Sequence, residues 1–216
     1  TNKHDLQALL CDVLHAIIEK LGNSLHSDKV RESDPFMLLQ FCRVLTCDCS
    51  TARDKAALTI GALARAVGPK FLDFMPIFLQ YYSVKLFSPI YLEVIGTIFH
   101  ALGDEILPCC DHMMDVLYEG LSQPELKPRI FACFGEIALA IGKIFEEKYL
   151  QAVRKELKEA ANPRYYANVS DEDKVDYGNQ LRQGICKAYS GILRGIKDQK
   201  SGLKVAADLV EFIEAV

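Results

Sequence analysis

Hydrophobic residues recur at steps of three and four along almost the whole chain. This spacing predicts amphipathic α-helices, because residues three or four apart share one helix face. In the stretch 5–22, the apolar positions are Leu6, Leu9, Leu10, Val13, Leu14, Ile17 and Leu21. The same period predicts helices over 35–46, 52–68, 70–86, 89–103, 105–121, 126–142, 144–161, 172–197 and 203–216. The alternation typical of strands is absent from the sequence, so we expect an all-α protein.

Three of the predicted helices share a pattern in which two glycines lie seven positions apart among apolar residues. The copies lie at 60–68, 95–103 and 134–142, and weaker copies lie at 14–22 and 189–197. The intervals between successive copies from the first to the one at 134–142 average about 40 residues, which is typical of HEAT or armadillo-type repeats with two helices each. We therefore predict an α-solenoid of about five HEAT repeats, each an antiparallel helix pair.

The repeat divides the chain into five predicted units and one loop. The units are approximately 1–50, 51–87, 88–123, 124–161 and 171–216, and residues 162–170 form the loop. The first glycine of each copy lies in mid-helix, where glycine costs up to about 1 kcal/mol relative to alanine. We expect close packing between neighbouring first helices to offset that cost. The second glycine is expected to end the first helix in a left-handed conformation.

Composition narrows the classes of function. The 216 residues include 25 Lys and Arg against 29 Asp and Glu, a net charge of −4, so a nucleic-acid partner is not expected and any charged partner should be basic. No apolar run approaches the roughly 18 to 20 residues of a membrane-spanning helix, so we expect no membrane contact.

The eight cysteines lie mostly in apolar stretches, which favours a reduced, intracellular protein. Because the chain starts without Met, we expect a piece of a longer protein.

Two groups of cysteines are the candidates for metal or thiol chemistry. Cys109 and His112 are three residues apart, and Cys47 and Cys49 flank a single residue, but neither pair has a second ligand pair at zinc-site spacing. Phosphate-binding loops, nucleophile elbows and dinucleotide fingerprints are also missing from the sequence. We expect no catalytic residue, metal or cofactor, and a thiol or metal enzyme is the alternative to a binding scaffold.

The most informative charges form an acidic stripe on the predicted helix 105–121. Like charges four residues apart oppose helix stability and are tolerated most readily when a partner compensates, which favours a basic ligand. No Lys or Arg occurs between Gly103 and Lys127. Tyr118 lies beside the stripe, where its ring could support a cationic side chain. The predicted protein-binding residues are Asp104, Glu105, Asp111, Asp115, Tyr118 and Glu119.

Two alternatives bear on this interpretation. The acidic stripe can be an ordinary solvated helix face, which needs no partner. Conversely, Asp208, Glu211 and Glu214 in the last predicted helix could extend an acidic surface.

Four stretches of the sequence resemble the C-terminal half of the importin-β family of nuclear transport receptors. They are DLQALLC at 5–11, ILPCCDHMMDVLYEGL at 106–121, LKPRIFACFGEIALAIG at 126–142 and DKVDYGNQLRQGICKAYSGILRGIK at 173–197. The order of the stretches also agrees with the family. The resemblance covers most of the chain, is strongest from 106 to 197 and is weak after 198. Another HEAT scaffold, such as another karyopherin or a phosphatase scaffold subunit, is the alternative.

The resemblance implies a right-handed superhelix of HEAT repeats whose second helices line the concave face. In this family an acidic concave surface wraps the basic importin-β-binding segment of importin-α, and other basic cargo is carried as well. The resemblance also implies contacts with the GTPase Ran and shuttling between cytoplasm and nucleus. It further implies a pocket for phenylalanine-glycine (FG) nucleoporins on first helices, at Leu92, Phe99, Phe131 and Ala138. Core packing between repeats is the alternative role for these four residues.

Overall fold

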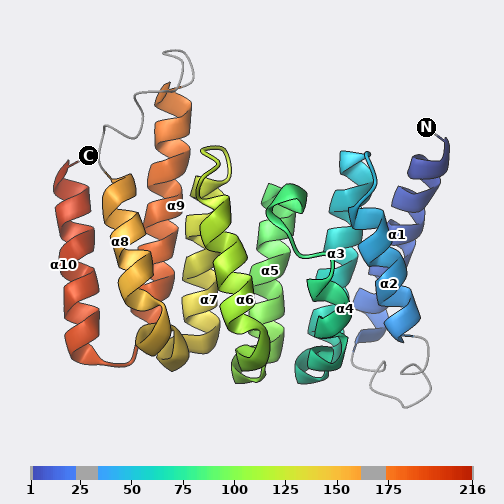
Figure 1. Cartoon of the computed structure of the whole chain (residues 1–216), viewed down its shortest axis with the longest axis horizontal. Helices are drawn as coiled ribbons and strands as arrows, with labels where there is room; N and C mark the ends of the chain where they lie inside the picture. Colours follow the sequence, from blue (N-terminus) through green and yellow to red (C-terminus); the bar gives the residue numbers. More distant parts are fainter. Residues whose placement is uncertain (1, 23–33, 162–173, 216) are drawn as a thin grey trace. The chain divides into compact units, whose positions relative to one another are not determined.

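In the computed structural model, which describes residues 2–22, 34–161 and 174–215, every regular element is a helix (Figure 1). The chain forms two compact units, an N-terminal unit, Thr1–Glu119, and a C-terminal unit, Gly120–Val216. The predicted loop 162–170 lies outside the described residues. None of the described helices is long and apolar enough to cross a lipid bilayer. The all-α prediction is therefore confirmed for the described residues.

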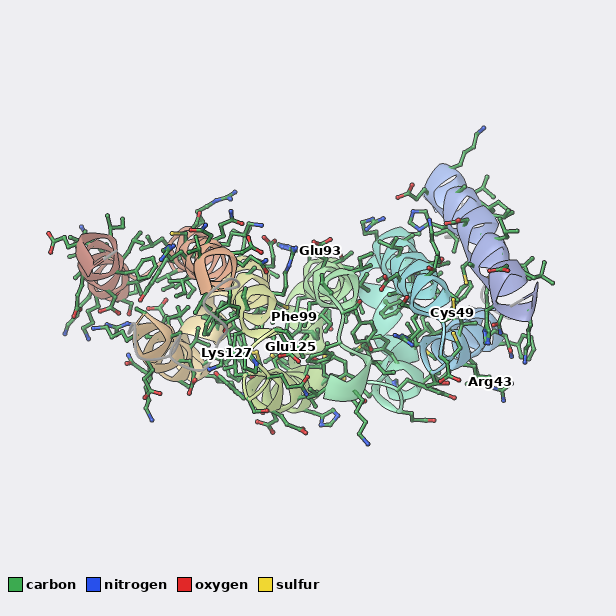
Figure 2. All side chains as sticks on the ribbon, turned by 90° about the horizontal axis from the view of Figure 1, so that it is seen from above. Arg43, Cys49, Glu93, Phe99, Glu125 and Lys127 are labelled. Atoms are coloured by element: carbon green, nitrogen blue, oxygen red, sulfur yellow. The ribbon has the colours of Figure 1, made fainter. Side chains whose placement is uncertain are left out.

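Among its described residues, the N-terminal unit holds six α-helices, joined in part by 3-10 turns. Helix α3 packs on both α1 and α5, while α2 packs on α3 and α4. Figure 2 shows α1, α3 and α5 in one layer, as the repeat predicts for neighbouring first helices. The α-helices are α1 (Asn2–Leu21), α2 (Asp34–Leu45), α3 (Ser50–Val67), α4 (Met75–Leu79), α5 (Pro89–Leu102) and α6 (Leu107–Gly120). The 3-10 turns are η2 (Gly68–Phe74), η3 (Val84–Leu86) and η4 (Gly103–Ile106).

A serine hydroxyl fixes the start of α5 and joins it to α3. Ser88 is the N-cap, and its Oγ accepts a hydrogen bond from the Tyr91 backbone N–H at 3.1 Å. Pro89 follows at the first helical position, where its missing N–H costs nothing. The same hydroxyl donates to Oδ1 of Asp54 on α3 at 2.9 Å. One side chain therefore both begins a helix and ties it to its neighbour.

The prediction of one helix over 70–86 is wrong. The structure has η2, which leads directly into α4, and then η3 after a turn. Proline is tolerated only in the first turn of a helix, so α4 begins at Met75, immediately before Pro76. The predicted helix 105–121 divides in the same way, because α6 begins at Leu107, immediately before Pro108, after the 3-10 turn η4.

The second glycine of each repeat copy ends or bends the first helix. Gly68 and Gly103 have φ of 63° and 53° and lie directly after α3 and α5, which confirms the prediction for these two copies. In the third copy, Gly142 has φ 1° and ψ −78°, and the helix bends there and continues to Lys148. Ile141 and Gly142 both have non-helical φ and ψ, so α7 is two helical segments joined by a kink at the boundary that the sequence predicts between 142 and 144.

The part of the C-terminal unit that the structure describes has four helices, and its central contact is between α7 and α9. Helix α8 packs on α7, and α10 packs on α9 and α8. The helices are α7 (Lys127–Lys148), α8 (Leu150–Ala160), α9 (Lys174–Gly195) and α10 (Gln199–Ala215).

Glycines allow the backbones of α7 and α9 to approach closely. A Cβ atom added to Gly135 would lie 2.6 Å from the carbonyl oxygen of Lys187 and 3.0 Å from Cα of Ala188. A Cβ atom on Gly191 of α9 would in turn meet the carbonyl oxygen of Gly135. In the N-terminal unit, a Cβ on Gly61 would meet only the Val94 side chain, at 3.3 Å. Close helix packing at the mid-helix glycine is therefore confirmed most clearly between α7 and α9.

Candidate acidic binding face on α6

Helix α6 has one buried face and one charged face. Cys110, Met113, Met114 and Leu117 are at most 1% exposed and form the buried face. Asp111, Asp115 and Glu119 lie four residues apart and are all exposed, as are Asp104 and Glu105 on η4. Tyr118 beside them is half-buried. We call Asp104, Glu105, Asp111, Asp115, Tyr118 and Glu119 the acidic face.

An aromatic side chain helps to position this helix. The Tyr82 hydroxyl donates a hydrogen bond to the backbone carbonyl oxygen of Met113 at 3.1 Å. The Tyr82 ring also meets the His112 ring edge-on, with 6.4 Å between the centroids. Buried methionines on one side and this hydrogen bond therefore set the orientation of α6.

Local structure explains only part of the negative charge. Asp104 and Glu105 immediately precede α6, where the positive end of the helix dipole favours carboxylates. Glu119 lies in the last turn, where the dipole disfavours negative charge, and this turn contains no basic residue. Asp115 makes no ion pair with any residue that the structure describes. Asp115 is therefore available to a cationic partner.

The acids of α10 do not extend this charged surface in the way the sequence suggests. Asp208 is only 5% exposed, and its carboxylate accepts hydrogen bonds from Nε of Arg154 at 2.6 Å and Nζ of Lys158 at 2.7 Å. Burial raises the pKa of Asp208, but these two hydrogen bonds outweigh burial and hold the pKa below its usual value. Lys158 also pairs with Glu211 at 3.4 Å. The suggestion of an open acidic surface is therefore wrong for Asp208, whereas Glu211, although paired with Lys158, and Glu214 are exposed.

The four residues suggested for nucleoporin binding are buried. Leu92 and Phe99 of α5 are 2% and 0% exposed, and Phe131 and Ala138 of α7 are 1% and 0% exposed (Figure 2 labels Phe99). Their burial favours a packing role, and binding at these positions would require the helices to move. Their nucleoporin role stays a prediction.

A groove between two neighbouring first helices does occur within the C-terminal unit. It lies between α7 and α9, has a volume of about 160 Å³ and is lined mainly by polar side chains and small residues. The lining residues are Pro128, Arg129, Ala132, Gln180, Gln183, Gly184 and Lys187. This groove could not be predicted from the sequence, because a glycine within a helix, such as Gly184, indicates close helix packing and not a binding site.

The thiols do not form a metal-binding cluster. Within 2–22, 34–161 and 174–215, no three His, Cys, Asp or Glu side chains are placed to hold a metal ion together. Burial raises the pKa of Cys42 to about 12 and also raises the pKa of Cys109. A thiol with a raised pKa is a poor nucleophile and a poor ligand. These residues therefore offer structural thiols rather than a reactive centre.

Comparison with known proteins finds one family. The family model described as importin subunit beta-1-like, TPR repeats, matches residues 1–216. Importin subunit beta-1 of Arabidopsis thaliana is 39% identical over 228 residues, covering 99% of this chain and 26% of that protein. The chain thus spans about a quarter of the length of the curated relative it matches.

Two solved structures of yeast Kap95 resemble the chain in fold. The Kap95:Nup1 complex has a TM-score of 0.77 at 27% identity and covers 99% of this chain and 25% of that one. The second structure has a TM-score of 0.66 at 26% identity and covers 97% of this chain and 25% of that one. In it, Kap95p binding induces the switch loops of RanGDP to adopt the GTP-bound conformation. The predicted HEAT-repeat solenoid class is confirmed by these similarities.

Proposed function

This chain belongs to the importin-β family, and from that membership we propose that it is part of a nuclear transport receptor that binds basic segments on the acidic face of α6. It acts as a binding scaffold, with no catalytic step. The match of the family model to the whole chain favours this function over a phosphatase scaffold or a thiol enzyme.

The observation that supports this proposal most directly is the concentration of exposed carboxylates along α6. Asp111, Asp115 and Glu119 follow one exposed edge of the helix for two turns, and Glu119 lies at the end where the dipole disfavours it. A basic helix laid along this edge would place Lys or Arg side chains against successive carboxylates. Such complementarity mainly increases specificity and the rate of association.

The partner that fits this chemistry is the basic importin-β-binding segment of importin-α, or a basic segment of cargo. Ran and FG nucleoporins are further proposed partners, supported by the similar Kap95 structures with Nup1 and with RanGDP. We place FG binding at Leu92, Phe99, Phe131 and Ala138, which would have to become accessible first. A receptor with these partners would shuttle between cytoplasm and nucleus.

The direct test is binding of a fluorescent importin-α basic segment, measured by anisotropy at several salt concentrations. The variant Asp111→Lys, Asp115→Lys, Glu119→Lys should bind more weakly, because three attractive pairs become repulsive. Exposed pairs contribute roughly 0.2 to 1 kcal/mol each, so the loss of three pairs should lower affinity by about 3- to 150-fold. The salt dependence of the remaining binding should also be smaller.

A control with the same change in net charge separates the acidic face from general electrostatics. Asp5, Asp48 and Asp73 are exposed and lie outside the acidic face, so their joint replacement by Lys should reduce affinity much less. Equal losses in the two triple variants, or unchanged affinity in the first with an intact circular dichroism spectrum, would contradict the assignment. Repeating the measurement with Ran in its GTP form tests whether the two partners compete.

A further inference from the structure

Four cysteines of the N-terminal unit belong to α1, α2 and the turn between α2 and α3. Cys11 of α1 and Cys42 of α2 are 3% and 0% exposed, whereas Cys47 and Cys49 in the turn are half-buried. Figure 2 labels Cys49, and other sulfur atoms, drawn in yellow, lie near it. Burial raises the pKa of Cys11 to about 11 and that of Cys42 to about 12, which makes both poor nucleophiles. Within this group, the two cysteines of the turn are therefore the thiols that a solute can reach.

The turn brings these two thiols close together. Two successive residues span about 7 Å even in a fully extended chain. The chain bends at Cys47 and Asp48, which shortens this span into the range of roughly 4.4 to 6.8 Å between Cα atoms that a disulfide bridges. Sγ of Cys47 donates a weak hydrogen bond to the carbonyl oxygen of Cys49, with 3.5 Å between the two atoms. The Cys47 side chain therefore already points towards Cys49.

Hydrogen bonds from the adjacent helices hold the turn in this shape. Nη1 of Arg53 donates to the carbonyl oxygen of Cys47 at 2.7 Å, and the Cys47 N–H donates to the carbonyl oxygen of Val44 at 3.1 Å. Cys49 is the N-cap of α3, and its carbonyl oxygen accepts the Arg53 N–H at 3.0 Å. Both backbones are thus fixed, while the Cys49 thiol makes no capping hydrogen bond and can turn towards Cys47.

The turn is also accessible to small molecules. Thr46, Asp48 and Ser50, which flank the two cysteines, are exposed. Half-buried thiols between exposed residues admit a molecule of the size of hydrogen peroxide more readily than a bulky reagent. A small oxidant can therefore reach the pair without unfolding of α2 or α3.

We propose that Cys47 and Cys49 form a redox-sensitive dithiol, which a peroxide converts to an internal disulfide. One thiol attacks the peroxide, the O–O bond breaks, and a sulfenic acid and one water form. The second thiol then attacks the sulfenic sulfur, so that the S–S bond forms and a second water leaves. The two thiols lose two electrons and two protons in all, and the peroxide takes them up. A disulfide in an accessible turn is open to attack by thiols, so the modification is reversible.

A single tryptic peptide isolates the pair. The peptide 44–53 contains Cys47 and Cys49 and no other cysteine. The folded 216-residue chain is treated with hydrogen peroxide near pH 7, and the remaining thiols are blocked with N-ethylmaleimide. Mass spectrometry should then find this peptide two hydrogens lighter and unblocked, and dithiothreitol should restore both thiols. A Cys11–Cys47 disulfide, which would join two tryptic peptides, would overturn the proposal. Sulfenic or sulfinic acids at Cys47 and Cys49 without a link between them would do so as well.

Substitutions identify the two sulfurs. Cys47→Ser and Cys49→Ser should each abolish the loss of two hydrogens, and dimedone should instead trap a sulfenic acid on the cysteine that remains. Serine is a favourable N-cap, so Cys49→Ser should retain the fold. Cys186→Ser, which removes the exposed cysteine of α9, is the matched control and should leave the link unchanged. Persistence of the link in either turn variant would contradict the assignment.

Equilibrium in glutathione buffers tests whether the fold positions the pair. The effective concentration of one thiol at the other should be at least about tenfold higher in the folded chain than in the chain unfolded by urea, because the turn holds the two residues together. Equal effective concentrations would show that sequence proximity alone forms the link, and the proposal would then fail.

Discussion

Replacing Gly135 by alanine tests the close contact between α7 and α9 most directly. In an exposed helix this change stabilises by up to about 1 kcal/mol, because alanine has the higher helix propensity. Here the new methyl group would lie 2.6 Å from the Lys187 carbonyl oxygen and 3.0 Å from Cα of Ala188. Both are backbone atoms, which cannot rotate away as a side chain can, so α9 as a whole would have to shift.

The sign of the effect follows from comparing these two contributions. Overpacking a tight core costs about 1 to 3 kcal/mol, which exceeds the gain in propensity. We expect Gly135→Ala to lower the free energy of unfolding by about 1 to 2 kcal/mol, and Gly135→Leu to lower it further. At Gly61 the neighbour is the Val94 side chain at 3.3 Å, so Gly61→Ala should cost less than Gly135→Ala.

Urea unfolding followed by circular dichroism measures these differences, and Gly202 is the matched control. Gly202 also lies in a helix, α10, but a Cβ there would meet nothing within 4 Å. Gly202→Ala should therefore raise the free energy of unfolding by about 0.5 to 1 kcal/mol. If Gly135→Ala raised it by the same amount, the reasoning from helix packing would be refuted.

Two further predictions concern charge and thiol burial. Asp208→Asn should lower the free energy of unfolding at pH 7 by about 1 to 3 kcal/mol, measured by thermal or urea unfolding. Because the pKa of Asp208 in the folded protein lies below its usual value, this stabilisation is present above about pH 4 and is lost as pH falls through the folded pKa. A difference between the two proteins that stays constant down to pH 2 would contradict the prediction. Iodoacetamide at pH 8 should label the exposed Cys186 rapidly but Cys42 only after unfolding, since Cys42 is fully buried and its pKa is raised to about 12. Mass spectrometry of both sites measures the two rates, and labelling of Cys42 before Cys186 would contradict the prediction.

The helices could be predicted from apolar spacing because most of them are covered on one side only. The exceptions show what spacing alone omits. Over 70–86 the apolar period is unbroken, but Pro76 cannot sit inside a helix, and the segment divides there. At Gly142 the glycine permits φ near 1°, yet the apolar residues that follow still pack as a helix, so α7 bends and continues. Proline and glycine therefore compete with side-chain packing, and whether the helix ends or only bends differs from one site to the next.

The apolar stripe of α1 shows a second limit of sequence reasoning. Spacing correctly groups Leu6, Val13 and Ile17 on one face of the helix. It does not indicate what lies against that face, and in this chain the face is exposed while Cys11 and Ile18 contact the unit. The amphipathic pattern reports a surface that favours a partner, whether that partner lies within the chain or outside it.

The two acidic groups make the same point for charge. Asp208 and Glu211 of α10, like Asp111 and Asp115 of α6, lie on one side of a helix, so helical spacing cannot distinguish them. The two groups differ in what the adjacent second helix offers them. Helix α8 carries Arg154 and Lys158 four residues apart, on one face, where both reach carboxylates of α10. In the N-terminal unit the preceding second helix, α4, is Met-Pro-Ile-Phe-Leu and has no charged residue to offer α6. Acids that pair with bases inside their own unit, as Asp208 does, stabilise the fold. The second helix that precedes α6 supplies no basic residue, and this is why we assign binding to α6 rather than to α10.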